Sequence, residues 1–131
     1  MMELTLKENI TYKLGNDVLS LQEFEQSINP SFIRRVFTEK ERAYANQFHE
    51  PNLRYASTFS AKEAVYKALK QFDSSIKLPW KKIEITREKI AGKPEVELFL
   101  QESQFEVSLS ISHDGNYVWA VALAHRISAF F

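Results

Sequence analysis

Two carboxylates and one lysine are the residues of this chain best suited to chemistry. Asp17 comes directly after Gly15 and Asn16 at the predicted end of a strand, where a carboxylate can point at a ligand. An aspartate at such a corner can equally accept a hydrogen bond from its own backbone. Glu63 and Lys67 lie one turn apart within a predicted helix, so their side chains leave the same face.

The spacing of Glu63 and Lys67 has two interpretations. A glutamate followed by a lysine four residues later is the favoured ion pair on a solvated helix, and it contributes only about 0.2–0.5 kcal/mol. The neighbours Ala61 and Ala64 are small, however, so a ligand can approach this part of the helix closely. Together, the carboxylate and the ammonium groups of Lys62 and Lys67 could then hold a divalent metal and the phosphate oxygens to which it bridges.

A histidine and a group of basic residues extend the set of candidates. His113 ends a predicted strand before the turn Asp114-Gly115, where it either completes the turn or donates a hydrogen bond to a phosphate or hydroxyl group. The basic cluster, as we call it below, consists of Arg34, Arg35, Lys40 and Arg42. It indicates either a solvated helix face, since two glutamates lie within it, or a docking surface for an acidic protein.

The composition fits one globular domain and excludes several classes of site. The 131 residues are 44% hydrophobic, and 17 basic residues balance 17 acidic ones, so the overall charge does not favour nucleic acid. The chain has no cysteine, which excludes disulfides, thiolate metal sites and cysteine nucleophiles and favours a reducing cytoplasm. No apolar run reaches the roughly 20 residues that span a bilayer, and no signal peptide is expected in the first ten residues.

The elements that must position these residues are predicted from hydrophobic spacing and capping signals. A strand is expected over 10–14, a polar corner at Gly15 to Asp17, and a short helix after the N-cap Ser20. Thr38 and Glu41 form a capping box that begins a helix ending near residue 48. A helix of about 20 residues is expected over 53–72, because apolar residues recur there at three- and four-residue steps. Its polar side carries Arg54, Lys62, Glu63, Lys67 and Lys70.

The C-terminal half alternates with a period of two residues. Strands are expected over 81–86, 96–100, 105–111 and 117–124, with turns at 91–94 and at Asp114-Gly115. Two consecutive hairpins predict an antiparallel sheet of about four strands. With the first strand and the long helix, the pattern predicts a single α+β domain over 1–131, in which the antiparallel sheet packs on a long central helix.

Several short motifs follow one another over most of the chain. The most specific is Phe59-Ser60-Ala61-Lys62-Glu63-Ala64 with Lys67-Ala68-Leu69. The others are Gly15-Asn16-Asp17-Val18, Phe32 to Thr38 with Glu41, Trp80 ahead of Ile83-Glu84-Ile85, Gly92-Lys93-Pro94, and Leu109 to Gly115. In order and spacing this set resembles the holo-acyl-carrier-protein synthase family, the short class of 4′-phosphopantetheinyl transferases.

The resemblance implies a reaction and the residues that carry it. A serine hydroxyl of an apo acyl carrier protein attacks the β-phosphate of coenzyme A, phosphopantetheine is transferred, and 3′,5′-ADP leaves. By this resemblance Asp17 and Glu63 hold Mg²⁺, and Lys67 acts with them by neutralising a phosphate oxygen.

The resemblance also implies binding residues and partners. The residues assigned to coenzyme A are Arg54, Lys62, Lys67, Gly92, Lys93, Pro94 and His113. Docking of the carrier protein is assigned to Arg34, Arg35 and Arg42 of the basic cluster. Members of the short class are typically homotrimers with active sites between subunits, so a cytoplasmic homotrimer is expected, with neither nucleic acid nor membrane as a partner.

Two departures from the family pattern concern coenzyme A. Thr58 stands where the family often has an arginine that holds coenzyme A, and Arg54, one turn earlier, is expected to substitute for it in part. Residues 70–75 contain no glycine, whereas the family usually has a glycine-rich loop there. These departures indicate a divergent member that serves one particular carrier protein.

Two other functions stay open at this point. One is a degenerate module that binds a carrier protein and has weak or no affinity for coenzyme A. The other is a different Mg²⁺-dependent phosphohydrolase that uses the same two carboxylates.

Overall fold

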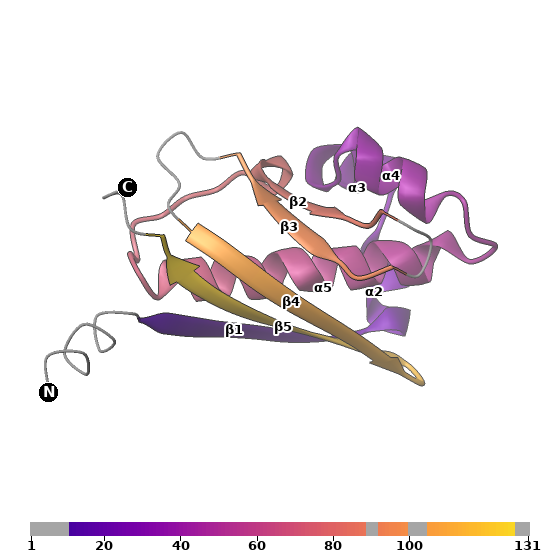
Figure 1. Ribbon diagram of the computed structural model, residues 1–131. Coiled ribbons are helices and arrows are strands. Elements are labelled where there is room, and N and C mark those ends of the chain that lie inside the picture. The colour runs from indigo at the N-terminus through magenta and orange to yellow at the C-terminus, as the bar shows by residue number, and fades with distance from the viewer. Residues whose placement is uncertain (1–10, 89–91, 100–104, 128–131) are drawn as a thin grey trace, which may run out of the picture.

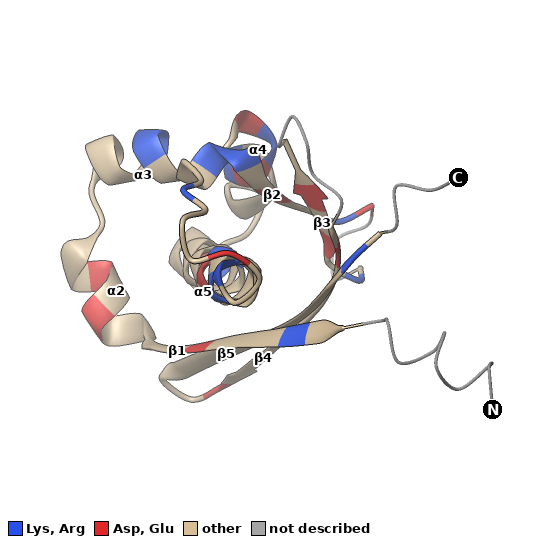
Figure 2. Cartoon of the chain, turned by 90° about the vertical axis from the view of Figure 1, so that its left-hand side faces the viewer, with Lys and Arg blue, Asp and Glu red and all other residues tan. Residues whose placement is uncertain are grey.

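The computed structural model describes residues 11–88, 92–99 and 105–127 and has one long helix at its centre. This helix, α5 (Pro51–Lys70), is viewed end-on in Figure 2, with the larger sheet on one side and three shorter helices and a smaller sheet around the others. The predicted α+β fold with an antiparallel sheet on a long central helix is confirmed. Since most residues of α5 are buried, the helix has only a narrow exposed face.

The main sheet is antiparallel and has the strand order β1-β5-β4. Its strands are β1 (Tyr12–Ser20), β4 (Phe105–Asp114) and β5 (Tyr117–Arg126). The predicted hairpin joins β4 to β5, and Gly115 in its turn has a φ of 57°, a value that favours glycine. The polar corner predicted at 15–17 is wrong, because β1 continues through these residues and pairs with β5 along its whole length.

A second, smaller sheet contains β2 (Ile83–Thr86) and β3 (Glu95–Leu98), which pair antiparallel. The prediction that these strands form one four-stranded sheet is therefore wrong, because the two hairpins belong to different sheets. β3 lies beside β4 in Figure 1 but forms no ladder with it. β1, from the opposite end of the chain, occupies the second edge of β5 instead. Ile10, Ala91 and Leu100, which bound the predicted strands and turn, lie outside the described residues.

Local capping begins each short helix. In α2 (Leu21–Ser27) the N-cap Ser20 accepts a hydrogen bond from the third amide, and α4 (Glu39–Ala45) has the predicted capping box of Thr38 and Glu41. The helix α3 (Pro30–Val36) is not among the predicted elements, because an Asn-Pro pair is also typical of the end of a helix. Asn29 is its N-cap and Pro30 its first residue, a position that tolerates proline because no backbone N–H is needed there. A short 3₁₀ turn, η1 (Trp80–Lys82), leads into β2.

Gly15 allows β1 to approach α5 closely. A Cβ atom at this position would lie 2.0 Å from the carbonyl oxygen of Ala64 and 2.6 Å from the backbone nitrogen of Ala68. No side chain fits in that space. The glycine thus determines how near Asp17, two residues further along β1, lies to the helix.

Replacing Gly15 by alanine should destabilise the fold by about 3 kcal/mol, since the contacted atoms are helix backbone and cannot rotate away. The measurement is the urea unfolding midpoint at an unchanged m-value. The matched control is Asn16→Ala, an exposed neighbour on the same strand, which should change stability by less than about 0.5 kcal/mol. Equal midpoints for the two variants would show that the strand can move away from α5.

Candidate functional site

The structure brings Asp17 of β1 beside the exposed face of α5. The Ser60 hydroxyl donates to Asp17 Oδ2 at 2.9 Å, and Lys67 Nζ lies 3.1 Å from Asp17 Oδ1. Lys67 also donates to the carbonyl oxygen of Asn16 at 3.1 Å. Because Ser60, Glu63 and Lys67 follow one another at three- and four-residue steps, they lie on one face of the helix. Residues from two distant parts of the chain therefore form one polar site.

The Asp17 carboxylate lies close enough to Glu63 to affect the charge of that residue. Partial burial and then the neighbouring Asp17 carboxylate raise the pKa of Glu63, while the Lys67 ammonium opposes the rise. Two carboxylates that repel each other in a half-buried site are stabilised by a cation between them. The pair thus fits a hard divalent metal such as Mg²⁺. No group of three metal-ligating side chains occurs in the described part of the chain, so substrate oxygens and water would complete the coordination.

Aromatic rings form the wall on the other side of Glu63. Phe59 and Tyr66 lie one turn before and after it on α5, and the Trp80 ring is 5.3 Å from Phe59 and 6.1 Å from Tyr66. Phe32 of α3 packs on Phe59 at 5.5 Å, which places α3 next to the same wall. The site therefore has a charged side formed by β1 and an aromatic side formed by α3 and η1.

Ser60 was not among the predicted site residues. Its signal in the sequence is its position three residues before Glu63, on the same helix face. The side chain is fully buried and holds Asp17 through both the carboxylate and the backbone carbonyl oxygen. It therefore orients Asp17.

The expectation that Lys62 binds coenzyme A is wrong. Its side chain is fully buried, and Nζ lies 2.7 Å from Glu41 Oε1, 2.8 Å from the Val36 carbonyl oxygen and 2.9 Å from the Trp80 carbonyl oxygen. An ammonium group has three donors, and all three are used. Glu41 also accepts hydrogen bonds from the backbone of Thr38 and of β2. The pair joins α3, α4, η1 and β2 to the central helix.

Arg54 and Thr58 also lie away from the two carboxylates. Nine positions separate Arg54 from Glu63, about two and a half turns, so their side chains leave opposite sides of α5. The Arg54 guanidinium stacks over the Phe48 ring at 4.0 Å. Thr58 is buried and cannot reach a ligand at the surface. The structure therefore does not support a substitution of Arg54 for the family arginine at this site.

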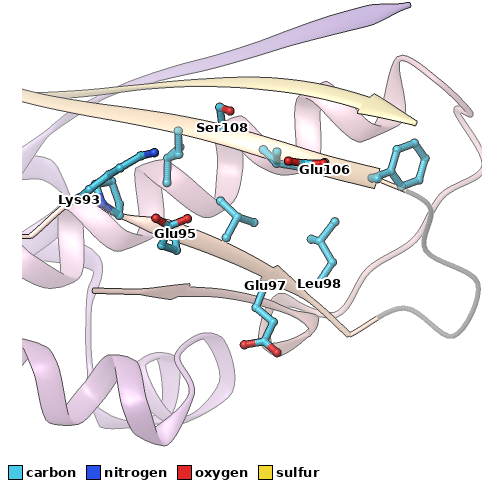
Figure 3. A pocket seen from close by; sticks show the side chains of 11 residues that line it. Lys93, Glu95, Glu97, Leu98, Glu106 and Ser108 are labelled. Carbon is cyan, nitrogen blue, oxygen red and sulfur yellow. The ribbon is translucent and has the colours of Figure 1, made fainter. Parts of the chain in front are cut away.

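The remaining predicted contacts to coenzyme A do not meet Asp17 and Glu63 within one chain. Gly92, Lys93 and Pro94 precede β3, and Lys93 and Pro94 line a cavity of about 450 Å³ between β3 and β4 (Figure 3). His113 lies near the end of β4, separated from Asp17 by β5, and its Nε2 is 3.0 Å from the Gly115 carbonyl oxygen. Within one chain, neither Lys93 and Pro94 nor His113 therefore lies at the pair of carboxylates.

The basic cluster divides between two helices. Arg34 and Arg35 are exposed in the last turn of α3, close to the aromatic wall, and Lys40 is exposed on α4 (Figure 2). Arg42 differs from them, because its guanidinium donates to the Phe37 carbonyl oxygen at 3.1 Å and is partly occupied in holding the end of α3. The part of the cluster available to a partner is therefore Arg34, Arg35 and Lys40.

The model of one protein family matches residues 13–122, a range that includes Asp17, the α5 motif and His113. The chain belongs to the 4′-phosphopantetheinyl transferase superfamily. A holo-[acyl-carrier-protein] synthase of Moorella thermoacetica is 40% identical to this transferase over 121 residues, which cover 83% of this chain and 90% of that protein.

Solved structures support the same assignment. The complex of Chronobacterium ammoniagenes ACPS with CoA has a TM-score of 0.76 and 28% identity, and the match covers 90% of this transferase and 98% of that chain. A holo-(acyl-carrier-protein) synthase of Bacillus anthracis, in complex with CoA, has a TM-score of 0.74 and 26% identity over 89% of this transferase and 98% of that chain. In the described part of the transferase, no helix is both long and apolar enough to cross a membrane.

Proposed function

We propose that this transferase moves 4′-phosphopantetheine from coenzyme A to a serine of an apo acyl carrier protein, with Mg²⁺ held by Asp17 and Glu63, and releases 3′,5′-ADP. The observation that carries the proposal is the convergence of the two carboxylates with Lys67 on one exposed face of α5. Relatives named for this activity, and neighbours solved with CoA, support it. The cytoplasmic location expected from the sequence belongs to the same proposal.

The reaction requires the protein mainly to position the reacting groups and to neutralise the charge on the phosphate oxygens. The serine oxygen forms a bond to the β-phosphorus and its hydroxyl proton passes to water. The bond from this phosphorus to the bridging oxygen breaks, so 3′,5′-ADP leaves with the electron pair. When bound, Mg²⁺ supplies neutralisation of the negative charge on the phosphate oxygens. Lys67 supplies a further positive charge from the same helix face and donates to the Asp17 carboxylate. The Ser60 hydroxyl also donates to this carboxylate and so fixes its position. The aromatic wall formed by Phe59, Tyr66 and Trp80 limits access of water from one side.

We further propose a homotrimer in which two neighbouring subunits together complete each site. Support comes first from the separation of Lys93, Pro94 and His113 from the two carboxylates within one chain. The second support is the outer sheet face, the side of the main sheet turned away from α5. It exposes large apolar residues on β1 and β5, namely Tyr12, Leu14, Val18, Tyr117, Trp119 and Leu123. An apolar area of this kind is typical of a protein interface.

Mixing the protein with apo carrier proteins, coenzyme A and Mg²⁺ and then weighing the carriers tests the proposed activity. A transferase adds one phosphopantetheine group to a carrier only when all components are present. A degenerate binding module retains a carrier on a column without changing its mass. A phosphohydrolase cleaves coenzyme A without any carrier. Either of the last two results would replace the proposed function.

The exposed arginines of α3 are the proposed contact for an acidic helix of the carrier protein. Arg35→Glu should lower kcat/KM for the carrier about tenfold at low salt and leave coenzyme A binding unchanged, because charges at an interface rim act mainly on association. The wild-type rate should fall as salt rises to about 0.5 M, since screening shortens the reach of the charges.

The matched control for this variant is Arg126→Glu, which reverses an exposed arginine at the end of β5. It should retain the wild-type rate and salt dependence. The same rate and the same salt slope for Arg35→Glu and the wild type would show that α3 is not the docking surface.

A further inference from the structure

A cavity of about 260 Å³ lies between α4 and the end of β2, on the side of α5 away from Glu63. Its polar lining combines two cationic side chains, Lys40 and Arg87, with the hydroxyl residues Tyr44 and Thr86. Lys40 and Tyr44 lie one turn apart on α4 and therefore share a face. None of the described residues that line the cavity is acidic.

Within residues 11–88, 92–99 and 105–127, no acidic side chain pairs with the cations around this cavity. Arg87 stacks over the Tyr44 ring at 4.7 Å, and Arg54 stacks over Phe48 at 4.0 Å, while the two rings are 5.1 Å apart. Among the described residues, no carboxylate lies within ion-pair distance of Lys40, Arg54 or Arg87. Stacking fixes the plane of a guanidinium through its face and leaves the N–H donors at its edge available. The N–H donors of two guanidinium groups are thus held in place with no carboxylate partner in the described part of the chain.

Two further observations show that this arrangement is unfavourable without an anion. The Tyr44 hydroxyl is buried and has no hydrogen-bond partner among the described residues. A buried hydroxyl without a partner costs free energy, so such groups are rare. Burial lowers the pKa of Arg87, Tyr44 opposes this shift, and the nearby Arg54 charge, the smallest of the three effects, lowers the pKa again. An anion in the cavity would relieve both the desolvated guanidinium and the repulsion between the arginines.

We propose that this cavity is a binding site for the phosphate group of a phosphate monoester, separate from the site at Asp17 and Glu63. A monoester fits better than a carboxylate, because it carries nearly two negative charges at neutral pH and three strong acceptor oxygens. Arg87 binds through its free edge and Lys40 adds a second charge. The Tyr44 hydroxyl, which is shielded when the cavity is empty, turns into the cavity and donates to a phosphate oxygen. Arg54 contributes through its field, since it lies beside the cavity and does not line it.

The test is a titration of the intact protein with inorganic phosphate and with methyl phosphate, compared with chloride at matched ionic strength. Both probes should raise the melting temperature and shift the NMR signal of the Arg87 side chain. Arg87→Gln should weaken both effects about tenfold, the loss expected for a hydrogen bond to a charged group. The matched control is Arg126→Gln, since Arg126 also stacks on aromatic rings but has Asp73 nearby. It should respond like the wild type.

The variant Tyr44→Phe distinguishes a lost contact to phosphate from a general loss of stability. Without phosphate its melting temperature should rise slightly, because an unpartnered buried hydroxyl is removed, while the stabilisation by phosphate should decrease. Lys67→Met, at the other site, should leave the phosphate response unchanged.

Three outcomes would overturn the proposal. These are no response to either probe, a response of the Arg87→Gln variant equal to that of the wild type, or a response that is lost in Lys67→Met instead. Binding of inorganic phosphate without methyl phosphate would exclude a monoester as the ligand. None of these measurements uses transfer activity. A failure of the proposed phosphate site can therefore be distinguished from a failure of the proposed function.

Discussion

Replacing Glu63 by glutamine should lower the rate of phosphopantetheine transfer about a thousandfold while leaving the fold intact. The substitution keeps the shape of the side chain and removes one negative charge from the pair that faces Lys67. A metal ion contributes several kcal/mol of charge stabilisation in such reactions, and each 1.36 kcal/mol is a factor of ten in rate. The measurement is transfer to a carrier protein under saturating coenzyme A, followed by mass spectrometry.

A second measurement distinguishes a metal ligand from a residue that affects the rate without binding the metal. The Mg²⁺ concentration that gives half-maximal rate should rise in Glu63→Gln, and the unfolding midpoint should stay the same or increase, because the repulsion from Asp17 is removed. Glu23→Gln, an exposed change of the same type on α2, is the control and should retain full activity. Near-normal turnover of Glu63→Gln would exclude Glu63 from the mechanism.

Replacing Trp119 by glutamate should convert the proposed trimer into monomers and lower transfer at least about a hundredfold. Trp119 is 52% exposed on the outer sheet face, on the middle strand β5, and lies next to Val18 on β1. A carboxylate there would be buried without a partner in an assembled trimer, at a cost of several kcal/mol for each subunit. Sedimentation velocity gives the mass, and the transfer assay gives the rate.

Complementation tests whether the sites lie between subunits. Glu63→Gln and His113→Ala, each expected to be inactive alone, should recover part of the activity when they are mixed and reassembled, because one subunit then supplies the intact carboxylates and the other the intact histidine. Gln26→Glu on α2 adds the same charge away from the sheet and should stay trimeric and active. An unchanged mass and rate for Trp119→Glu would show that this face is not the interface.

The buried pair of Lys62 and Glu41 explains why two adjacent residues of one motif have different roles. Consecutive residues on a helix point about 100° apart. Lys62 therefore points into the interior, where it meets Glu41, while Glu63 points toward Asp17 at the surface. A motif alone gives the order of residues but not the direction that each one faces.

Several features of this protein follow from its sequence alone. Capping at Ser20 and Thr38, the apolar recurrence over α5 and the turn Asp114-Gly115 are local signals, because each depends on residues within one or two turns of the chain. The residues around Glu63 resembled one enzyme family, and the family match confirms that resemblance. Spacing along one helix was enough to place Glu63 and Lys67 on one face.

Only the tertiary structure decided which distant residues meet. Pairing of β1 with β5 depends on contacts between the two ends of the chain, and the fit of Gly15 against Ala64 and Ala68 sets how near Asp17 comes to α5. The same long-range packing turned Lys62 inward to Glu41 and placed Arg87 over the Tyr44 ring, where no described residue forms an ion pair with it. Side-chain direction and burial depend on every element that packs against a residue, and the period of a single segment contains no such information.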